Sequence, residues 1–351
     1  MGLLETTQTY IKPVNTALEP EIQKHLDSLT KPQGSLGYLE EIAKRYCLIT
    51  NTTKPKMKEK VIFTFAADHG VAEEGVSAYP KEVTAQMVLN MLYNSAAVNV
   101  LARYVGAFVN VVDIGVDYNF DNAGGLIDRK LLYGTDNITK GMAMSVEKAH
   151  QAIDIGISLA HEAIDDGATL IGTGEMGIAN TTPSSALFAA LMGVDVEEVT
   201  GLGTGIDNER LKHKTDVIKR ALEVNKEHLQ DPVEALAAVG GLEIAGICGT
   251  IIGAASRNTP VVIDGFISSA AALVACKICP KTKDYMFFSH QSKEKGHKKF
   301  LEWIGARPIL DLDMRLGEGT GAALAFNVIE ASVKIYNEMA TFESAGVSNK
   351  E

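Results

Sequence analysis

Two glutamates stand inside glycine-rich segments, where an acid can act on a bound ligand. Glu318 lies within Gly317–Gly321, and Glu175 lies within Gly172–Gly177. Glycine lets the backbone approach a ligand closely, and backbone N–H groups at such turns favour phosphate. Paired acids can divide base and electrostatic roles, and they suit glycosidic-bond chemistry, in which positive charge develops. The alternative for each acid is a first-turn residue that favours the helix dipole.

A third glycine-rich segment, Gly201–Gly205, is followed by the basic cluster Lys212–Lys214. This cluster either contacts a phosphate or forms a solvated helix start. The segment Gly172–Gly177 has the form G-x-G-x-x-G, but a dinucleotide fold expects an acid at the end of the next strand, about 20 residues on. Asp195 follows no strand pattern, so a mononucleotide phosphate fits these loops better than a dinucleotide.

The histidines and cysteines give no metal pattern. His69 and His290 each follow an apolar segment, but no third ligand stands at a suitable spacing. Cys276 and Cys279 are spaced like a metal or redox pair, yet no second pair exists and Pro280 follows directly. That pair is more typical of the end of a buried helix. We therefore expect neither a metal nor another cofactor.

Composition excludes some classes of partner. The 351 residues include 33 basic and 44 acidic side chains, for a net charge of −11. This charge disfavours nonspecific binding to nucleic acid or to anionic membranes. No apolar run reaches the roughly 20 residues of a membrane span. The first 20 residues lack the apolar core of a signal peptide. We expect a cytoplasmic protein.

The elements that must position the glycine-rich loops follow an alternating pattern. Helical patterns cover Val83–Tyr104, Val146–Asp166, Thr215–Leu229 and Leu242–Ser256. Short apolar segments between them lack polar alternation, as strands buried on both faces do. These predicted strands are Val61–Ala67, Ala107–Asp113, Thr169–Gly172, Val261–Asp264, Tyr285–Ser289 and Pro308–Leu312. The alternation predicts an α/β fold with a doubly wound, mainly parallel sheet of about six strands.

Polar residues follow nearly every predicted strand. They are Asp68, His69, Asp113, Glu175, Asp264, Ser289, His290, Arg315 and Glu318. Ligands of open parallel sheets bind outside the carboxyl ends of the strands, so these groups are expected to converge on one crevice. The alternative is that Asp and Gly only end the strands as turn residues.

Several longer motifs together resemble one family. They are Lys31–Gly37, Ala67–Val71, Gly75–Pro80, Gly174–Thr182 and Arg315–Gly319. In this order they are similar to the motifs of the nicotinate-nucleotide:dimethylbenzimidazole phosphoribosyltransferases, which activate the lower-ligand base of cobamides. The likeness runs from about Leu29 to Met339. It implies a small helical domain from residues 1–55 and 325–351 and a large α/β catalytic domain from residues 56–324.

The resemblance also implies a reaction. The 5-phosphoribosyl group of nicotinate mononucleotide passes to 5,6-dimethylbenzimidazole or a related base, giving an α-ribotide phosphate and nicotinate. The general base of the family falls on Glu318, and its second acid, near the ribose, falls on Glu175. No metal is required.

The remaining contacts implied by the resemblance lie in two groups. Those to phosphate and ribose are Gly177, Asn180, Thr181, Gly203, Lys214, Ser289 and Arg315. Those to the aromatic base are Tyr79, Gln86, Met87 and Leu316. The family forms dimers whose sites take a lysine from the partner subunit, and Lys214 matches that lysine.

Three alternatives remain open at this point. The same chemistry on phenol or p-cresol would give O-linked α-ribotides, and some relatives of that kind work as two different subunits. A nucleotide-binding, non-catalytic subunit would keep the fold without the reaction. A nucleosidase-like hydrolase would use water in place of the base.

Overall fold

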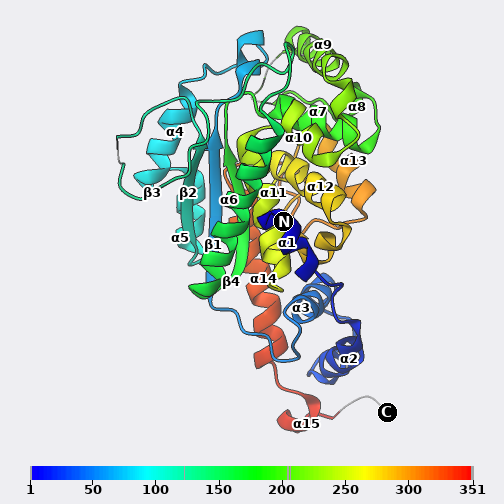
Figure 1. The fold of residues 1–351 in the computed structure, drawn as a ribbon. Coiled ribbons are helices and arrows are strands. Elements are labelled where there is room, and N and C mark those ends of the chain that lie inside the picture. Colours follow the sequence, from blue (N-terminus) through cyan, green and yellow to red (C-terminus); the bar gives the residue numbers. More distant parts are fainter. Residues whose placement is uncertain (1, 122, 204, 206, 349–351) are drawn as a thin grey trace.

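The computed structural model describes residues 2–121, 123–203, 205 and 207–348 (Figure 1). At its centre lies a six-stranded sheet in the order β3-β2-β1-β4-β5-β6, and each pair of neighbouring strands is parallel. The strands are β1 Glu59–Ala67, β2 Phe108–Gly115, β3 Leu126–Asp128, β4 Ala168–Met176, β5 Val261–Ile263 and β6 Met286–Phe288. The predicted doubly wound parallel sheet is therefore confirmed.

One predicted strand is wrong and one strand was missed. Pro308–Leu312 forms no strand, because only Leu310 makes an isolated bridge, to His290, beyond the end of β6. Pro308 has no N–H to give to a ladder. The missed strand is β3, which has three residues and pairs only with β2 at the edge of the sheet.

Helices cover both faces of the sheet (Figure 1). Their bounds are α1 Leu3–Tyr10, α2 Glu19–Ser28, α3 Tyr38–Ile49, α4 Val83–Leu92, α5 Ala97–Tyr104, α6 Val146–Asp165, α7 Thr181–Met192, α8 Val196–Val199, α9 Asn208–Val224, α10 Pro232–Val239, α11 Leu242–Ser256, α12 Phe266–Ile278, α13 Lys295–Ile304, α14 Thr320–Glu338 and α15 Phe342–Ala345. In the described part of the chain, none of them combines the length and apolar character needed to cross a membrane.

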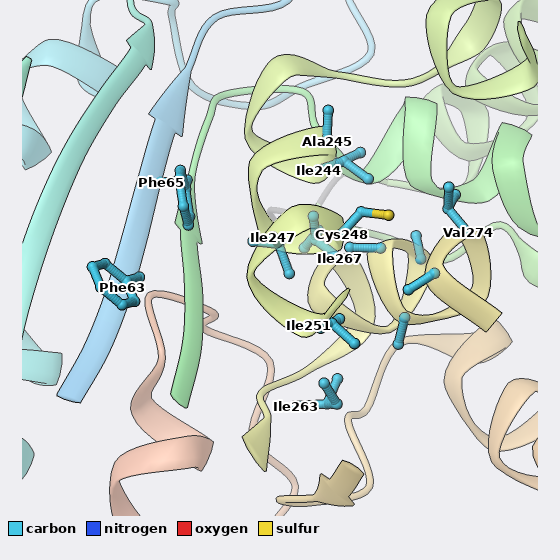
Figure 2. Packing of buried hydrophobic residues seen from close by; sticks show 14 of the residues in the cluster. Phe63, Phe65, Ile244, Ala245, Ile247, Cys248, Ile251, Ile263, Ile267 and Val274 are labelled. Carbon is cyan, nitrogen blue, oxygen red and sulfur yellow. The ribbon is translucent and has the colours of Figure 1, made fainter. Parts of the chain in front are cut away.

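Alternate side chains of β1 face different helices. Phe65 faces α11, since a Cβ on Gly246 of that helix would lie 2.7 Å from the Phe65 ring. Figure 2 shows Phe65 on the side of β1 that faces Ile247, and Phe63, two residues earlier in the strand, shares that face. A Cβ on Gly319, just before α14, would lie 2.7 Å from Ile62 on the opposite face. β1 is thus buried on both faces, which explains its lack of polar alternation.

Helices α6 and α11 approach each other through glycine. A Cβ on Gly156 would lie 1.9 Å from the Gly246 carbonyl oxygen, and one on Gly249 would lie 1.9 Å from that of Ile153. Such contacts exclude any side chain at these positions. The close approach places α11 firmly between α6 and the sheet.

A small hydrophobic cluster lies apart from the main core. It is formed by Ile22, Leu26, Leu29, Ala43, Cys47 and Tyr336, from α2, α3 and the end of α14. By contrast, α1 packs on α6 and α11, and the Leu4 amide donates to Asp154 at 3.0 Å. The division into residues 1–55 with 325–351 and residues 56–324 stays a prediction.

Candidate active site

A cavity of about 430 Å³ opens at the carboxyl ends of β4, β5 and β6. Its lining residues are Tyr79, Glu175, Met176, Gly177, Ile178, Asn180, Thr181, Gly203, Gly265, Phe266, Ile267, His290, Ser292, Glu294, Arg315, Leu316 and Gly317. This is the edge of a doubly wound sheet at which ligands bind. A larger cavity of about 730 Å³ lies beside β3, but of the strand-end polar residues predicted to converge on one crevice it is lined by Asp113 alone. We therefore take the smaller cavity as the candidate active site.

The cavity brings together most of the predicted site residues. Those in its lining are Tyr79, Glu175, Gly177, Asn180, Thr181, Gly203, Arg315 and Leu316. Glu318, Lys214 and Ser289 are buried next to lining residues. The structure does not bring Gln86 or Met87 into the lining: both lie on α4, where Gln86 is exposed and Met87 half-buried.

The loop that carries Glu318 is held by neighbouring strands. Glu318 has φ +65°, between glycines that also have positive φ. Its carbonyl accepts a hydrogen bond from Thr64 of β1 at 2.9 Å. A Cβ on Gly174 of β4 would lie 2.3 Å from that carbonyl oxygen, so only glycine fits there. Asp264, after β5, accepts from the Gly319 amide at 3.2 Å and from the Ala322 amide at 3.0 Å. The start of α14 is thereby fixed.

The Glu318 carboxyl group is buried and incompletely paired. The side chain is 4% exposed, and its Oε2 has no hydrogen-bond partner among the described residues. Burial raises the pKa of Glu318, while the backbone amide of Val98 opposes the rise. A carboxyl group with a raised pKa and a free oxygen is suited to accept a proton near neutral pH.

Glu175 lies against the same loop. A Cβ on Gly317 would fall 2.1 Å from Glu175 Oε1, and Asn180 donates a hydrogen bond to Oε2. Burial raises the pKa of Glu175 to about 8, and the nearby acids Asp264 and Glu318 add to the rise. A pKa raised to this value favours the protonated side chain at neutral pH.

Cationic and backbone groups gather at the other side of the cavity. Lys214 Nζ donates to Thr181 Oγ1 at 2.6 Å, at the N-terminus of α7. Arg315 donates to the Gly203 carbonyl at 3.2 Å. Burial lowers the pKa of Lys214 to about 8, against the opposing charge of Glu294. A helix N-terminus with two cations nearby favours the binding of an anion such as phosphate.

Lys214 contacts a residue that lines the cavity of its own chain. The resemblance implied that this lysine would serve the site of a partner subunit. The side chain is only 1% exposed, and its ammonium group contacts Thr181 of the same chain.

Some residues of the site were not among the predicted site residues. Asp264 and His290 follow predicted strands, and that position indicated a place at the site, but neither was assigned a role. Ser292 and Glu294 stand in a lysine-rich stretch without any motif. Glu294 lies against the glycine-rich loop, with Oε2 3.4 Å from the Gly203 amide nitrogen.

A buried acid–histidine pair lies beneath the cavity floor. His69 Nε2 is 2.8 Å from Glu243 Oε1, and a Cβ on Gly177 would lie 3.2 Å from that ring nitrogen. In the part of the chain that the structure describes, no three His, Cys, Asp or Glu side chains are arranged to hold a metal ion.

The fold and the cavity define an α/β class of protein with its ligand site at the carboxyl edge of a parallel sheet. Residues 11–347 match a phosphoribosyltransferase family. A nicotinate-nucleotide–dimethylbenzimidazole phosphoribosyltransferase from Chlorobaculum tepidum is 60% identical over 340 residues, 97% of this chain and 96% of the relative. One from Geobacter sp. strain M21 is 57% identical over 349 residues, 99% of this chain and 100% of the relative. The crystal structure of such an enzyme from Thermus thermophilus superposes with a TM-score of 0.91 at 43% identity, over 96% of this chain and 100% of that one.

The chain belongs to the nicotinate-nucleotide–dimethylbenzimidazole phosphoribosyltransferase family. The resemblance found in the motifs is thus confirmed over nearly the whole length.

Proposed function

We propose that the protein transfers the 5-phosphoribosyl group of nicotinate mononucleotide to 5,6-dimethylbenzimidazole or a related lower-ligand base. The products are an α-ribotide phosphate and nicotinate. The observation that carries the proposal is the placement of two buried acids, Glu175 and Glu318, at one glycine loop beside a cationic helix N-terminus. The names of the relatives supply the substrates.

In the proposed mechanism Glu318 is the general base. Its carboxylate takes the N–H proton of the benzimidazole while the other ring nitrogen attacks C1′ of the ribose. The bond from C1′ to the pyridinium nitrogen breaks, and its electron pair neutralises that ring as nicotinate leaves. The new C1′–N bond forms on the face opposite nicotinate, and the proton remains on Glu318. Charge and atoms balance without a further reactant.

Glu175 has the electrostatic role. Positive charge begins on the pyridinium ring and spreads to C1′ as the bond breaks. A cation next to Glu175 favours its ionised form, so substrate binding would convert the neutral acid of the empty cavity into a carboxylate. Asn180, which donates to that carboxyl group, supports the ionised form.

The phosphate would be held by the groups at the start of α7. Lys214 and Arg315 supply charge, and the backbone of Gly177 and Gly203 together with Asn180 and Thr181 supplies short-range donors. Ser289 would act from behind the cavity wall, since its hydroxyl already donates to the Asp264 carbonyl at 2.5 Å.

The base pocket would lie at the mouth of the cavity. Tyr79 and Leu316 line it and are 55% and 57% exposed. A benzimidazole ring placed between them buries apolar area on both of its faces. Gln86 and Met87, on α4, would serve as outer contacts only.

Product analysis tests the proposal. Purified protein receives nicotinate mononucleotide with equal amounts of 5,6-dimethylbenzimidazole, adenine, phenol and p-cresol, and the products are identified by mass spectrometry. An N-linked benzimidazole ribotide as main product supports the proposal. An O-linked phenolic ribotide would assign the phenol-activating reaction instead. Ribose phosphate alone would indicate a hydrolase, and the absence of any product would favour a non-catalytic subunit.

We further propose that the protein is a cytoplasmic homodimer. All four cysteines are free and buried, as is usual in a reducing compartment. Light scattering on the purified chain measures the mass. If the chain is a monomer and becomes active only when a paralogous subunit is added, the homodimer proposal is wrong and the active form is a heterodimer.

A further inference from the structure

His290 stands two residues after the end of β6, in the wall of the cavity. Its side chain is 1% exposed, and its Nε2 has no hydrogen-bond partner among the described residues. Gly265 and Gly321 leave room for the ring: a Cβ on Gly321 would lie 2.1 Å from Nδ1, and one on Gly265 would lie 3.6 Å from Nε2. Gly265 and His290 both line the cavity, and the absence of a Cβ at Gly265 leaves space beside Nε2.

The hydrogen-bond network fixes the tautomer of this ring. The Ser289 hydroxyl has a single hydrogen, and it points to the Asp264 carbonyl oxygen at 2.5 Å, which can only accept. His290 Nδ1 lies 3.0 Å from the same hydroxyl oxygen. Nδ1 must therefore carry the ring hydrogen and donate it to Ser289. The Nε2 atom is left as a bare acceptor.

Burial keeps the ring neutral. It lowers the pKa of His290 to about 4, although Asp311 opposes the change. At neutral pH the cavity wall thus presents an uncharged acceptor. An unpaired buried acceptor costs free energy unless a ligand or water supplies a donor.

The proposed substrates contain few donors. In nicotinate mononucleotide near pH 8, the phosphate and the carboxylate only accept, and the pyridinium ring has no N–H. The two ribose hydroxyls are its only donors. The single N–H of the benzimidazole is assigned to Glu318. A bare acceptor in this cavity therefore matches a ribose hydroxyl.

We infer that His290 is a substrate-binding residue whose Nε2 accepts a hydrogen bond from a secondary hydroxyl of the ribose. This inference rests on the proposed function for the identity of the nucleotide. It makes the site selective for ribonucleotides over a deoxy analogue.

Calorimetric binding of nicotinate mononucleotide and its 2′-deoxy and 3′-deoxy analogues tests the inference, using wild type, His290→Asn and His290→Gln. Asn can replace the Nδ1 donor but not the Nε2 acceptor, whereas Gln reaches the position of Nε2 with an amide oxygen. We expect wild type to prefer the ribonucleotide over one deoxy analogue by about 3- to 10-fold. His290→Asn should lose that preference without binding the same analogue more weakly, and His290→Gln should restore part of it.

His297→Asn is the matched control. That ring is also buried, but the Ser292 backbone amide donates to its Nδ1 at 2.7 Å and its Nε2 is 2.9 Å from Ser269 Oγ, so both nitrogens are already paired. It should keep the wild-type preference. Thermal melts of all variants confirm folding.

An unchanged preference in both folded His290 variants, or no preference in wild type, would overturn the inference and point to a buried water as the partner of Nε2. Because the readout is binding, it separates the two proposals. Selective binding through His290 without any ribotide product would remove the proposed reaction and leave the inference standing. No binding of any of these nucleotides would remove both.

Discussion

A single unpaired carboxylate oxygen sets the expected chemistry at residue 318. Glu318→Gln keeps the shape of the protonated side chain and removes the ability to accept a proton. We expect kcat to fall by about 100-fold or more, the usual contribution of a general base, with little change in thermal stability. Steady-state kinetics with 5,6-dimethylbenzimidazole measures the effect. A wild-type kcat in the folded variant would exclude Glu318 as the base.

Glu175 predicts a pH-dependent stability. Its pKa is about 8 in the folded protein and about 4.3 in an unfolded chain. The folded state therefore binds more protons between these values, and the free energy of unfolding falls as pH rises through them. In Glu175→Gln the side chain cannot ionise, so this fall in the free energy of unfolding should be absent. The variant should match wild type at pH 5 and exceed it by about 1–3 kcal/mol at pH 8.5 in urea unfolding. Equal pH profiles would mean that Glu175 stays ionised in the empty cavity.

Lys214 predicts a pH-dependent affinity for the nucleotide. Its pKa is lowered to about 8 by burial, so the cation is present below that pH and is lost above it. The KM for nicotinate mononucleotide should rise above pH 8 in wild type. In Lys214→Met it should be about 10-fold higher and flat with pH. Lys212→Met, an exposed neighbour on α9, is the control. A rise that persists in Lys214→Met would assign the titration to another group.

At the scale of elements, the approach of α6 to α11 carries a stability prediction. A methyl group at residue 249 would lie 1.9 Å from the Ile153 carbonyl oxygen. Gly249→Ala should therefore force the helices apart and lower the free energy of unfolding by about 1–3 kcal/mol. Gly141→Ala is the control, because that glycine has no positive φ and a Cβ there would meet nothing within 4 Å. Denaturant unfolding gives both values, and a neutral Gly249→Ala would show that the helices separate freely.

The sequence predicted long buried strands better than short edge elements. β1 and β4 have no polar alternation because helices cover both faces, and that pattern is visible in the residues alone. Leu126–Asp128 is too short to show any period, and Pro308–Leu312 is apolar because it packs beside β6 without joining the sheet.

The site was predicted where glycine and acids form motifs. Glu175 and Arg315 line the cavity as expected. Glu294 gave no signal, because its role depends on a fold that brings α13 against the loop at Gly203. Gln86 and Met87 were placed by resemblance, and the sequence alone does not show that these residues of α4 lie outside the cavity lining.

At the scale of the whole molecule, α14 joins the active-site loop to the small cluster. It begins two residues after Glu318 and reaches Tyr336, whose carbonyl lies 2.7 Å from His25 Nε2. We propose that the cluster opens as a unit separate from the large core. Leu26→Ala should then lower the free energy of local opening by about 2–4 kcal/mol, and hydrogen exchange in α2 and α3 should become faster. Exchange in β1 and β4 should stay unchanged. A uniform change would mean one cooperative unit.

The fixed attachment of the Glu318 loop has a consequence for how such a protein changes over generations. Its backbone is tied to β1, β4 and β5, so substitutions there disturb folding and chemistry together. Tyr79 and Leu316 are more than half exposed at the cavity mouth, and replacing them costs little core packing. Two positions can therefore change with little loss of stability when selection favours a different acceptor base. Descendants of this chain can come to use different bases while they inherit the same reaction.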